Sequence, residues 1–267
     1  MIERIVNNFN LNQISESGQC FRMKKNGENI FVIIAGDQYL EVRQEDERCF
    51  FECEEAVFEN FWKGYFDLDT DYGEYIGQID SKDAYLKNAA KHGAGIRILR
   101  QDLWEMIITF LISQQNNITR ITRCIRNICE RYGEEKMTKS GKIYYAFPKP
   151  EALANLERAQ LDACNLGYRS KYVISTAKSI VSGSVDLKAI EQMSYENAKA
   201  ELLKLYGVGE KVADCICLFG LHQLQAFPVD THIRQALEVH YPDGFPFGLY
   251  RGFEGVLQQY IFYYELQ

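Results

Sequence analysis

The chain contains 267 residues, carries a formal net charge of −7 and is 46% hydrophobic, which allows one large domain or two smaller ones with a substantial core. No stretch of about 18 apolar residues occurs, so we expect no transmembrane helix and a cytoplasmic protein, or a nuclear one in a eukaryotic cell. The acidic balance is a mild argument against a nucleic-acid partner, because nucleic-acid-binding surfaces are usually basic.

The eight cysteines do not have the spacing of a metal site. None belongs to a Cys-x-x-Cys pair, the pattern typical of zinc and iron–sulfur sites, so we expect neither. A reducing compartment also argues against a disulfide framework. Cys124 and Cys129 lie in a helical pattern and are predicted to be thiols of the core.

The first part of the chain, residues 1–80, is predicted to be rich in strands. Compact or alternating apolar runs predict strands at residues 29–36, 37–44 and 48–54. The first two runs are joined by Ala-Gly-Asp-Gln, which is typical of a hairpin turn. Large apolar side chains then recur at helical spacing and predict a helix over residues 54–66.

Residues 81–267 change to helical patterns, although no clear linker marks the boundary between the two predicted domains. An almost wholly apolar segment at 102–113 predicts a buried helix. The helix expected next has an apolar stripe formed by Ile118, Ile121, Ile125 and Ile128. Further helices are predicted within 156–183, with a break at Gly167, within 194–221, with a break at 206–210, and at 229–241 and 252–267. These patterns indicate an α+β fold that is mainly helical.

The break at 206–210 contains Gly207, Val208 and Gly209. Glycine tolerates positive φ, and the unpaired N–H groups of the next helix face the same way as the turn. Such a turn can bind phosphate through backbone amides, which would let an acidic protein contact nucleic acid. An ordinary corner between two helices is the simpler explanation of the glycines alone.

Lys211 lies in the first turn of the predicted second helix, and Cys215 lies one turn later on the same face. A solvated lysine and a core cysteine are the ordinary explanations. Burial and the helix dipole favour a neutral amine, which can form a Schiff base, whereas a nearby thiolate would hold the ammonium. The sequence leaves both states open. Asp230 has the sequence context of a helix N-cap, which would fix its carboxylate.

Five segments resemble the helix-hairpin-helix DNA glycosylases, in particular their 8-oxoguanine branch. In chain order they are SESGQCFR, FLISQQNNITRI, NLGYRSKYV, GVGEKVADCICLF and FPVDTH. The resemblance extends from about residue 15 to the end of the chain. It implies the HhH-GPD glycosylase fold, with an N-terminal antiparallel sheet domain (TBP-like) and a helix-hairpin-helix unit at about residues 196–220.

The resemblance implies that Lys211 and Asp230 are catalytic. Lys211 would attack the sugar C1′ of a flipped nucleotide, expel the base and form a Schiff base, after which β-elimination would nick the strand. Asp230 would stabilise positive charge on the sugar. Base recognition is implied for Gly18, Cys215, Gln258 and Phe262. The Gly18 carbonyl would distinguish 8-oxoguanine, which carries a hydrogen at N7, from guanine, which has an acceptor there.

The resemblance also implies contacts with DNA. Tyr168 would wedge into the gap left by the base, Arg120 and Arg169 would contact the opposite cytosine, and His232 would bind a phosphate. The other implied DNA-binding residues are Gln115, Asn116, Asn117 and the hairpin residues Gly207, Val208 and Gly209. Gln115 stands where the family has its gap-filling asparagine, which leaves the filling residue and the strictness for cytosine open.

We therefore expect a monomeric enzyme that acts on double-stranded DNA containing 8-oxoguanine opposite cytosine, with no membrane partner. No cofactor is expected to be required, and a structural cation at the hairpin stays open. The family's iron–sulfur members carry four cysteines after the aspartate, and no cysteine follows Asp230 here, so no iron–sulfur cluster is expected. Two alternatives remain: a glycosylase of this fold for another damaged purine, and a non-catalytic helix-hairpin-helix DNA-binding protein.

Overall fold

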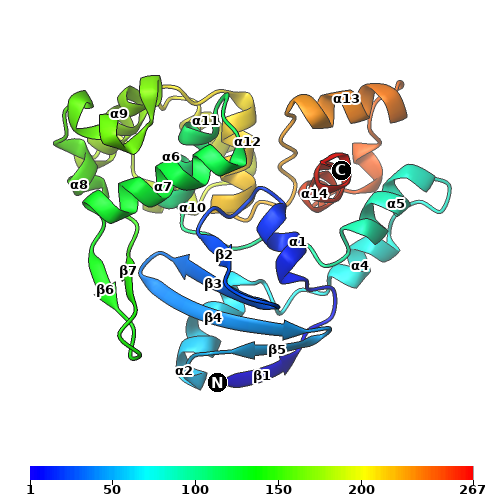
Figure 1. Cartoon of the computed structure of the whole chain (residues 1–267). Coiled ribbons are helices and arrows are strands. Elements are labelled where there is room, and N and C mark those ends of the chain that lie inside the picture. The colour runs from blue at the N-terminus through cyan, green and yellow to red at the C-terminus, as the bar shows by residue number, and fades with distance from the viewer. Residues whose placement is uncertain (267) are drawn as a thin grey trace.

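The computed structural model describes residues 1–266 and combines an antiparallel sheet with a larger group of helices (Figure 1). Within these residues the sheet has five strands in the order β1-β5-β4-β3-β2. The strands are β1 (Ile2–Ile5), β2 (Met23–Lys25), β3 (Ile30–Ala35), β4 (Gln38–Glu45) and β5 (Arg48–Phe51). This arrangement confirms the predicted fold class, α+β and mainly helical with an N-terminal antiparallel sheet.

The central hairpin of β3 and β4 forms as the sequence predicted. Alternate side chains of β3 are buried and those between them are partly buried, which explains why the strand is a continuous apolar run. Ala35 pairs with Gln38, and Gly36 in the turn between them adopts a φ of 55°, which glycine tolerates. The edge strands β1 and β2 were not predicted, because runs of four and three residues are too short to show a period.

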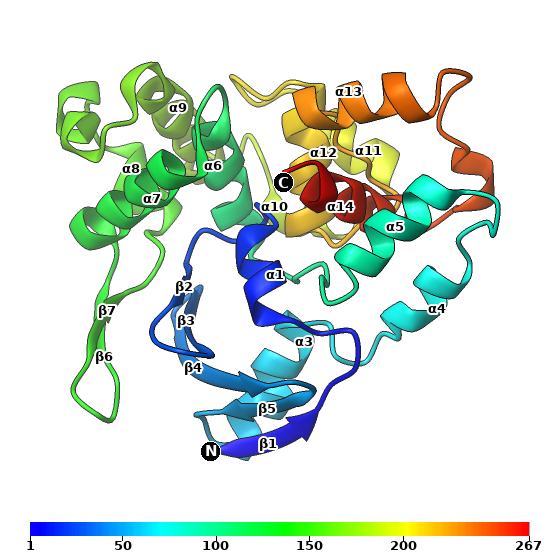
Figure 2. The same cartoon turned by 45° about the vertical axis from the view of Figure 1, so that its right-hand side comes forward.

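A helical segment after β5 packs against the sheet. It passes through α2 (Glu55–Val57), a π-helical turn (Phe58–Trp62) and α3 (Lys63–Tyr65), which confirms the helix expected over residues 54–66. Trp62 and Phe51 belong to the same buried cluster, so the segment and the sheet share a core. The short helix α1 (Leu11–Glu16), which the sequence did not reveal, lies between the sheet and the other helices in both views (Figure 1, Figure 2).

The helical part begins with α4 (Tyr72–Gly77) and α5 (Ala84–His92). It continues with α6 (Leu103–Ser113), α7 (Ile118–Tyr132), α8 (Pro150–Ala154), α9 (Ser170–Val181), α10 (Leu187–Glu191), α11 (Tyr195–Leu202), α12 (Glu210–Gly220), α13 (Thr231–His240) and α14 (Glu254–Glu265). A hairpin of β6 (Glu135–Met137) and β7 (Ile143–Tyr145) extends downward beside the sheet (Figure 2). Among the helices of residues 1–266, none combines the length and apolar character that crossing a bilayer requires.

Two details of the helical prediction were wrong. The first half of residues 156–183 forms 3-10 turns, Arg158–Cys164, instead of an α-helix. Asn165 and Gly167 both have a φ of 60°, so the chain leaves helical geometry twice before α9 begins. On α7 the buried stripe starts at Ile121, because Ile118 is 44% exposed at the helix start.

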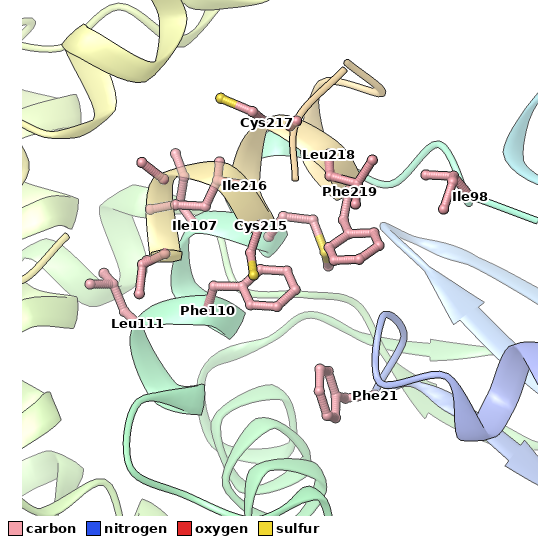
Figure 3. Packing of buried hydrophobic residues seen from close by; sticks show 14 of the residues in the cluster. Phe21, Ile98, Ile107, Phe110, Leu111, Cys215, Ile216, Cys217, Leu218 and Phe219 are labelled. Atoms are coloured by element: carbon pink, nitrogen blue, oxygen red, sulfur yellow. The ribbon is translucent and has the colours of Figure 1, made fainter. Parts of the chain in front are cut away.

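Helix α6 is the centre of the larger core, as its apolar sequence predicted. All its residues from Leu103 to Ile112 are buried, and it packs against α12. The rings of Phe110 on α6 and Phe219 on α12 stack with their centres 5.4 Å apart. Figure 3 shows the Cys215 side chain on the Phe110 side of α12, while Cys217 points away. This contact fixes the orientation of α12, the helix that carries Lys211.

The buried apolar residues form two clusters. The smaller one lies between the sheet and the segment of α2 and α3, and the larger one fills the helical part. Leu99 belongs to the smaller cluster and Phe21 to the larger one, so the chain crosses between the clusters more than once. The division of the chain at residue 81 stays a prediction.

A buried carboxylate, Asp67, joins the segment after α3 to the helical part. It accepts a hydrogen bond from the Tyr72 hydroxyl at 3.0 Å, and its oxygens lie 2.8 Å from Nη2 of Arg100 and 3.2 Å from Nε2 of His222. Burial alone would raise the pKa of Asp67, but the contacts with His222 and Arg100 outweigh burial and hold its pKa well below the usual value. The ionised carboxylate is therefore stabilised by folding.

The substitution Asp67→Asn tests this contribution. We expect it to lower the free energy of unfolding by about 3 kcal/mol at pH 7, because it removes a buried charge from its partners. A depressed pKa stabilises the fold above the unfolded-state value of about 3.9, and this stabilisation is lost as the pH falls toward the folded-state value. The difference between wild type and variant in urea unfolding should thus shrink between about pH 5 and pH 2.

The control for this prediction is Asp69→Asn. The Asp69 side chain is 77% exposed and pairs with Lys63 at the surface, so its loss should change stability little. A wild-type to Asp67→Asn difference that stays constant from pH 7 to pH 3 would contradict the assignment.

Candidate active site

Two helix N-termini meet at one pocket. Lys211 lies in the first turn of α12. Asp230 precedes α13, and its Oδ1 accepts a hydrogen bond from the backbone N–H of Ile233 at 2.9 Å, which confirms the predicted N-cap. Because this bond fixes the carboxylate, Asp230 is held at the pocket that Lys211 also lines.

The pocket brings together residues that are far apart in the sequence. Its wall consists of Ser17, Gly18, Phe110, Lys211, Cys215, Phe219, Pro228, Asp230, Gln258, Gln259 and Phe262. All the residues that the resemblance assigns to catalysis or base recognition are among them. The other wall residues were not identified from the sequence. Two of them, Phe110 and Phe219, have the pattern of ordinary core residues.

The pocket is small. Its volume of about 60 Å³ is far below the roughly 300 Å³ at which small-molecule pockets usually begin. Gly18, with a φ of 73°, lies against Phe262, and a Cβ atom at Gly18 would be 3.1 Å from Cε1 of that ring. A ligand the size of a purine therefore fits only if part of the wall moves, and the Phe262 side chain against Gly18 is one such part.

Cys215 is a buried thiol beside the lysine. Burial raises the pKa of Cys215, and the charge and hydrogen bond of Lys211 counteract this only in part. The structure therefore does not favour the thiolate–ammonium pair that the sequence left open. Lys211 itself is half-buried, with its Nζ 5.8 Å from the centre of the Phe110 ring.

At the hairpin between α11 and α12, the first backbone N–H groups of α12 have no partner within the helix. Gly207 has a φ of 93°, which confirms the tight turn, and Val208 N donates to the Leu205 carbonyl at 3.0 Å. Gly209 is the N-cap, is exposed, and has an extended backbone that any residue can adopt. Only Gly207 therefore needs to be glycine for conformational reasons.

Comparison with known proteins places the chain in a family. Residues 1–107 match the model of the 8-oxoguanine DNA glycosylase N-terminal domain, and residues 108–243 match that of the HhH-GPD superfamily base excision DNA repair proteins. The structure of MBOgg1 with a low-affinity DNA ligand aligns with a TM-score of 0.93 and 36% identity, covering 98% of this chain and 94% of that one. The chain belongs to the 8-oxoguanine DNA glycosylase family.

Two further relatives support this family membership. Clostridium acetobutylicum 8-oxoguanine glycosylase/lyase, solved with double-stranded DNA containing cytosine opposite 8-oxoguanine, aligns with a TM-score of 0.90 and 38% identity. That alignment covers 98% of this chain and 93% of the other. The Saccharomyces cerevisiae N-glycosylase/DNA lyase is 36% identical over 190 residues, or 66% of this chain and 50% of the relative. The chain spans 50% to 62% of the length of the first curated relatives that it matches.

The family's Gly-Tyr-Arg segment meets the turn between α6 and α7. Arg169 is only 3% exposed and donates hydrogen bonds to the carbonyls of Leu166, Gln114 and Gln115. Gln115 is exposed and has a φ of 47°, which is unusual for a residue other than glycine. Tyr168 is 38% exposed and stacks on the Arg169 guanidinium. Arg169 therefore shapes the turn, while Gln115 and Tyr168 face solvent.

The two asparagines of this turn are also engaged by the protein itself. Asn117 is the N-cap of α7 and accepts from Arg120 N at 2.9 Å, while Asn116 donates to the Ile112 carbonyl at 3.0 Å. Arg120 is partly exposed and donates a long, 3.4 Å hydrogen bond to the Asn165 carbonyl. His232 lies on the exposed face of α13, with its ring centre 6.3 Å from that of Phe262. Their contacts with DNA stay predictions.

Within residues 1–266, no group of three or more His, Cys, Asp or Glu side chains is arranged to hold a metal ion. The eight cysteines are free thiols, seven of them buried. A cation held by backbone carbonyls at the hairpin is a separate question, and it stays a prediction.

Substitution by alanine should lower the free energy of unfolding by different amounts at the two glycines of the hairpin. A Cβ at Gly207 would lie 2.5 Å from the Tyr172 ring, and its φ is unfavourable, so Gly207→Ala should lower the free energy of unfolding by about 2 kcal/mol. No atom lies within 4 Å of a Cβ at Gly209, so Gly209→Ala should cost less than about 1 kcal/mol. Equal losses in thermal or urea unfolding would contradict this geometry.

Proposed function

We propose that this protein is a bifunctional DNA glycosylase that excises 8-oxoguanine from duplex DNA and then nicks the strand at the abasic site. The observation that carries the proposal is the convergence of Lys211, Asp230 and Gly18 on one pocket. Family membership supports the proposal, because relatives that align with most of this chain are named N-glycosylase/DNA lyase or 8-oxoguanine glycosylase/lyase.

The chemistry begins when the damaged nucleotide is flipped out of the duplex, since its glycosidic bond is unreachable within the stack. The lone pair of neutral Lys211 Nζ attacks C1′, the bond from C1′ to the base breaks, and the base leaves with the electron pair. Opening of the sugar ring at O4′ then gives a Schiff base between Lys211 and C1′. The expelled base then takes a proton from C2′, a C2′–C3′ double bond forms, and the C3′–O3′ bond breaks, so that the 3′ phosphate leaves and the strand is nicked.

Asp230 acts electrostatically in this sequence. The sugar gains positive charge as the base departs, and a fixed carboxylate beside it stabilises that charge without needing to reorganise. The hydrogen bond from Ile233 N supplies the fixed position. Burial raises the pKa of the Cys215 thiol, so this side chain is not expected to add a negative charge beside Lys211.

Base selection is proposed to involve Gly18, Cys215, Gln258 and Phe262. A backbone carbonyl at Gly18 would accept the N7 hydrogen that 8-oxoguanine has and guanine lacks. Phe262, displaced from its contact with Gly18, would stack on the base, while Cys215 would contact its other face. Gln258 would bind its polar edge.

The DNA is proposed to lie across the hairpin and the turn between α6 and α7. The amides of Gly207, Val208 and Gly209 and the side chain of His232 would bind phosphates. Tyr168 would fill the gap in the duplex. Beside that gap would lie Gln115, Asn116 and Asn117. The opposite cytosine would be contacted by Arg120 and Arg169. Arg120 is the better placed reader of cytosine, because Arg169 already donates to three carbonyls.

The enzyme is proposed to act as a monomer and to need no cofactor, since an amine and a carboxylate suffice for both steps. An HhH-GPD enzyme for another damaged purine and a non-catalytic DNA-binding protein remain the competing functions. The first would excise its own lesion faster than 8-oxoguanine, and the second would excise nothing.

The variant Lys211→Gln tests the nucleophile. It should abolish base release, strand nicking and the borohydride-trapped complex, while binding of a duplex with 8-oxoguanine opposite cytosine is retained, because the pocket and hairpin remain. The control is Lys204→Gln, which removes an exposed lysine of the same segment that pairs with Glu201. A trapped complex formed by Lys211→Gln would show that another amine is the nucleophile.

The variant Asp230→Asn tests the electrostatic role. An asparagine can still cap α13, so folding and DNA binding should persist while single-turnover excision slows by about 100-fold or more. Asp186→Asn is the matched control, because Asp186 also caps a helix, α10, but lies outside the pocket. If both variants excised at the wild-type rate, Asp230 would be a cap and nothing more.

A further inference from the structure

Gln259 has a buried side-chain oxygen that no group in residues 1–266 satisfies. The residue is 3% exposed, lies on α14 and forms part of the wall of the pocket that contains Lys211 and Asp230. Buried polar atoms without a partner are rare in folded proteins, and each calls for a reason. A ligand that supplies a hydrogen-bond donor to this pocket is such a reason.

The orientation of the Gln259 amide is set by a chain of hydrogen bonds. The carbonyl of Pro228 can only accept, so Gln258 turns its Nε2 toward it at 3.0 Å. The Gln258 Oε1 then faces Gln259 and accepts from Gln259 Nε2 at 3.1 Å. Each amide group is thus fixed by the one before it, and the chain ends in the free Oε1 of Gln259.

The two glutamines together offer two acceptor oxygens to the pocket. Gln258 Oε1 uses one lone pair for Gln259, and the second lone pair of a carboxamide oxygen stays available. Gln259 Oε1 has both available. A guanine-type base presents two adjacent donors on its Watson–Crick edge, N1–H and the 2-amino group. An adenine-type edge alternates an acceptor with a donor and would place a lone pair against one of the glutamines.

We propose that Gln259 is a base-recognition residue whose Oε1 accepts a hydrogen bond from the Watson–Crick edge of the extruded guanine-type base. The proposal rests on the proposed function, since it requires a base in this pocket. It adds a second acceptor next to Gln258 and explains why an unpartnered oxygen is kept in the wall. Opening of the pocket at Phe262 would bring the base and this oxygen together.

The test measures binding with and without the base. In a Lys211→Gln background, which prevents turnover, the affinity for duplex DNA with 8-oxoguanine opposite cytosine is compared with that for the same duplex carrying a tetrahydrofuran abasic analogue. Adding Gln259→Met should weaken binding of the 8-oxoguanine duplex about tenfold, because a donor of the base loses its acceptor. Binding of the tetrahydrofuran duplex should change less than about twofold. Gln259→Leu serves as a second variant, and thermal unfolding verifies that each variant is folded.

The matched control is Tyr260→Phe. The Tyr260 hydroxyl is likewise buried and unpartnered within the described chain, but Tyr260 is not part of the pocket wall, so neither affinity should change. Equal weakening on both duplexes, or no weakening on either, would overturn the role of Gln259. If Lys211→Gln itself bound the 8-oxoguanine duplex no better than undamaged duplex, the proposed function would fail, and Gln259 recognition would fail with it.

Discussion

The site depends on a close contact at Gly255, near the start of α14. Its N–H donates to the Leu224 carbonyl at 2.6 Å, and a Cβ at this position would lie 2.5 Å from both the Ala226 carbonyl oxygen and the Leu218 side chain. Only glycine lets α14 approach the loop between α12 and α13 so closely. That loop leads to Asp230, α14 carries Gln258 and Phe262, and α12 carries Lys211. The proposed catalytic pair and the proposed base-binding residues therefore share one pocket because these elements are held together at Gly255.

The acidic character of the chain is compatible with a DNA substrate because the proposed phosphate contacts do not rely on many basic side chains. Free backbone N–H groups at the start of α12 attract anions whatever the net charge of the protein. Several of its arginines are engaged internally: Arg97 donates to four backbone carbonyls, and Arg22 pairs with buried Glu105. A protein that binds DNA mainly through amides and a few cations should also show a modest dependence of affinity on salt.

The parts of the fold that could be predicted from the sequence are those with a local signal. The β3–β4 hairpin has a turn sequence between alternating strands, α6 has a continuous apolar run, and Asp230 has the context of an N-cap. The short strands β1 and β2 carry no such signal, because they form only by pairing with the rest of the sheet. The α-helix expected in the first half of 156–183 was replaced by 3-10 turns, since Asn165 and Gly167 take left-handed geometry.

For the site, the motif residues could be named from the sequence but their environment could not. The raised pKa of Cys215 follows from burial against α6, and the internal hydrogen bonds of Arg169 follow from the path of the turn at Gln114 and Gln115. Gln259 has no motif, and its unpartnered oxygen results from the orientation of its neighbour. Each of these properties depends on tertiary contacts between segments distant in sequence, for which a single sequence holds no local signal.

The most direct measurement identifies the residue that becomes covalently linked to DNA. Wild-type protein is incubated with a duplex containing 8-oxoguanine opposite cytosine in the presence of borohydride, the reduced complex is digested, and the modified peptide is sequenced by mass spectrometry. The sugar adduct should lie on Lys211. An adduct on any other lysine or on the N-terminal amine, or a complex that forms equally well with undamaged duplex, would contradict the assignment of Lys211 as the nucleophile of this pocket.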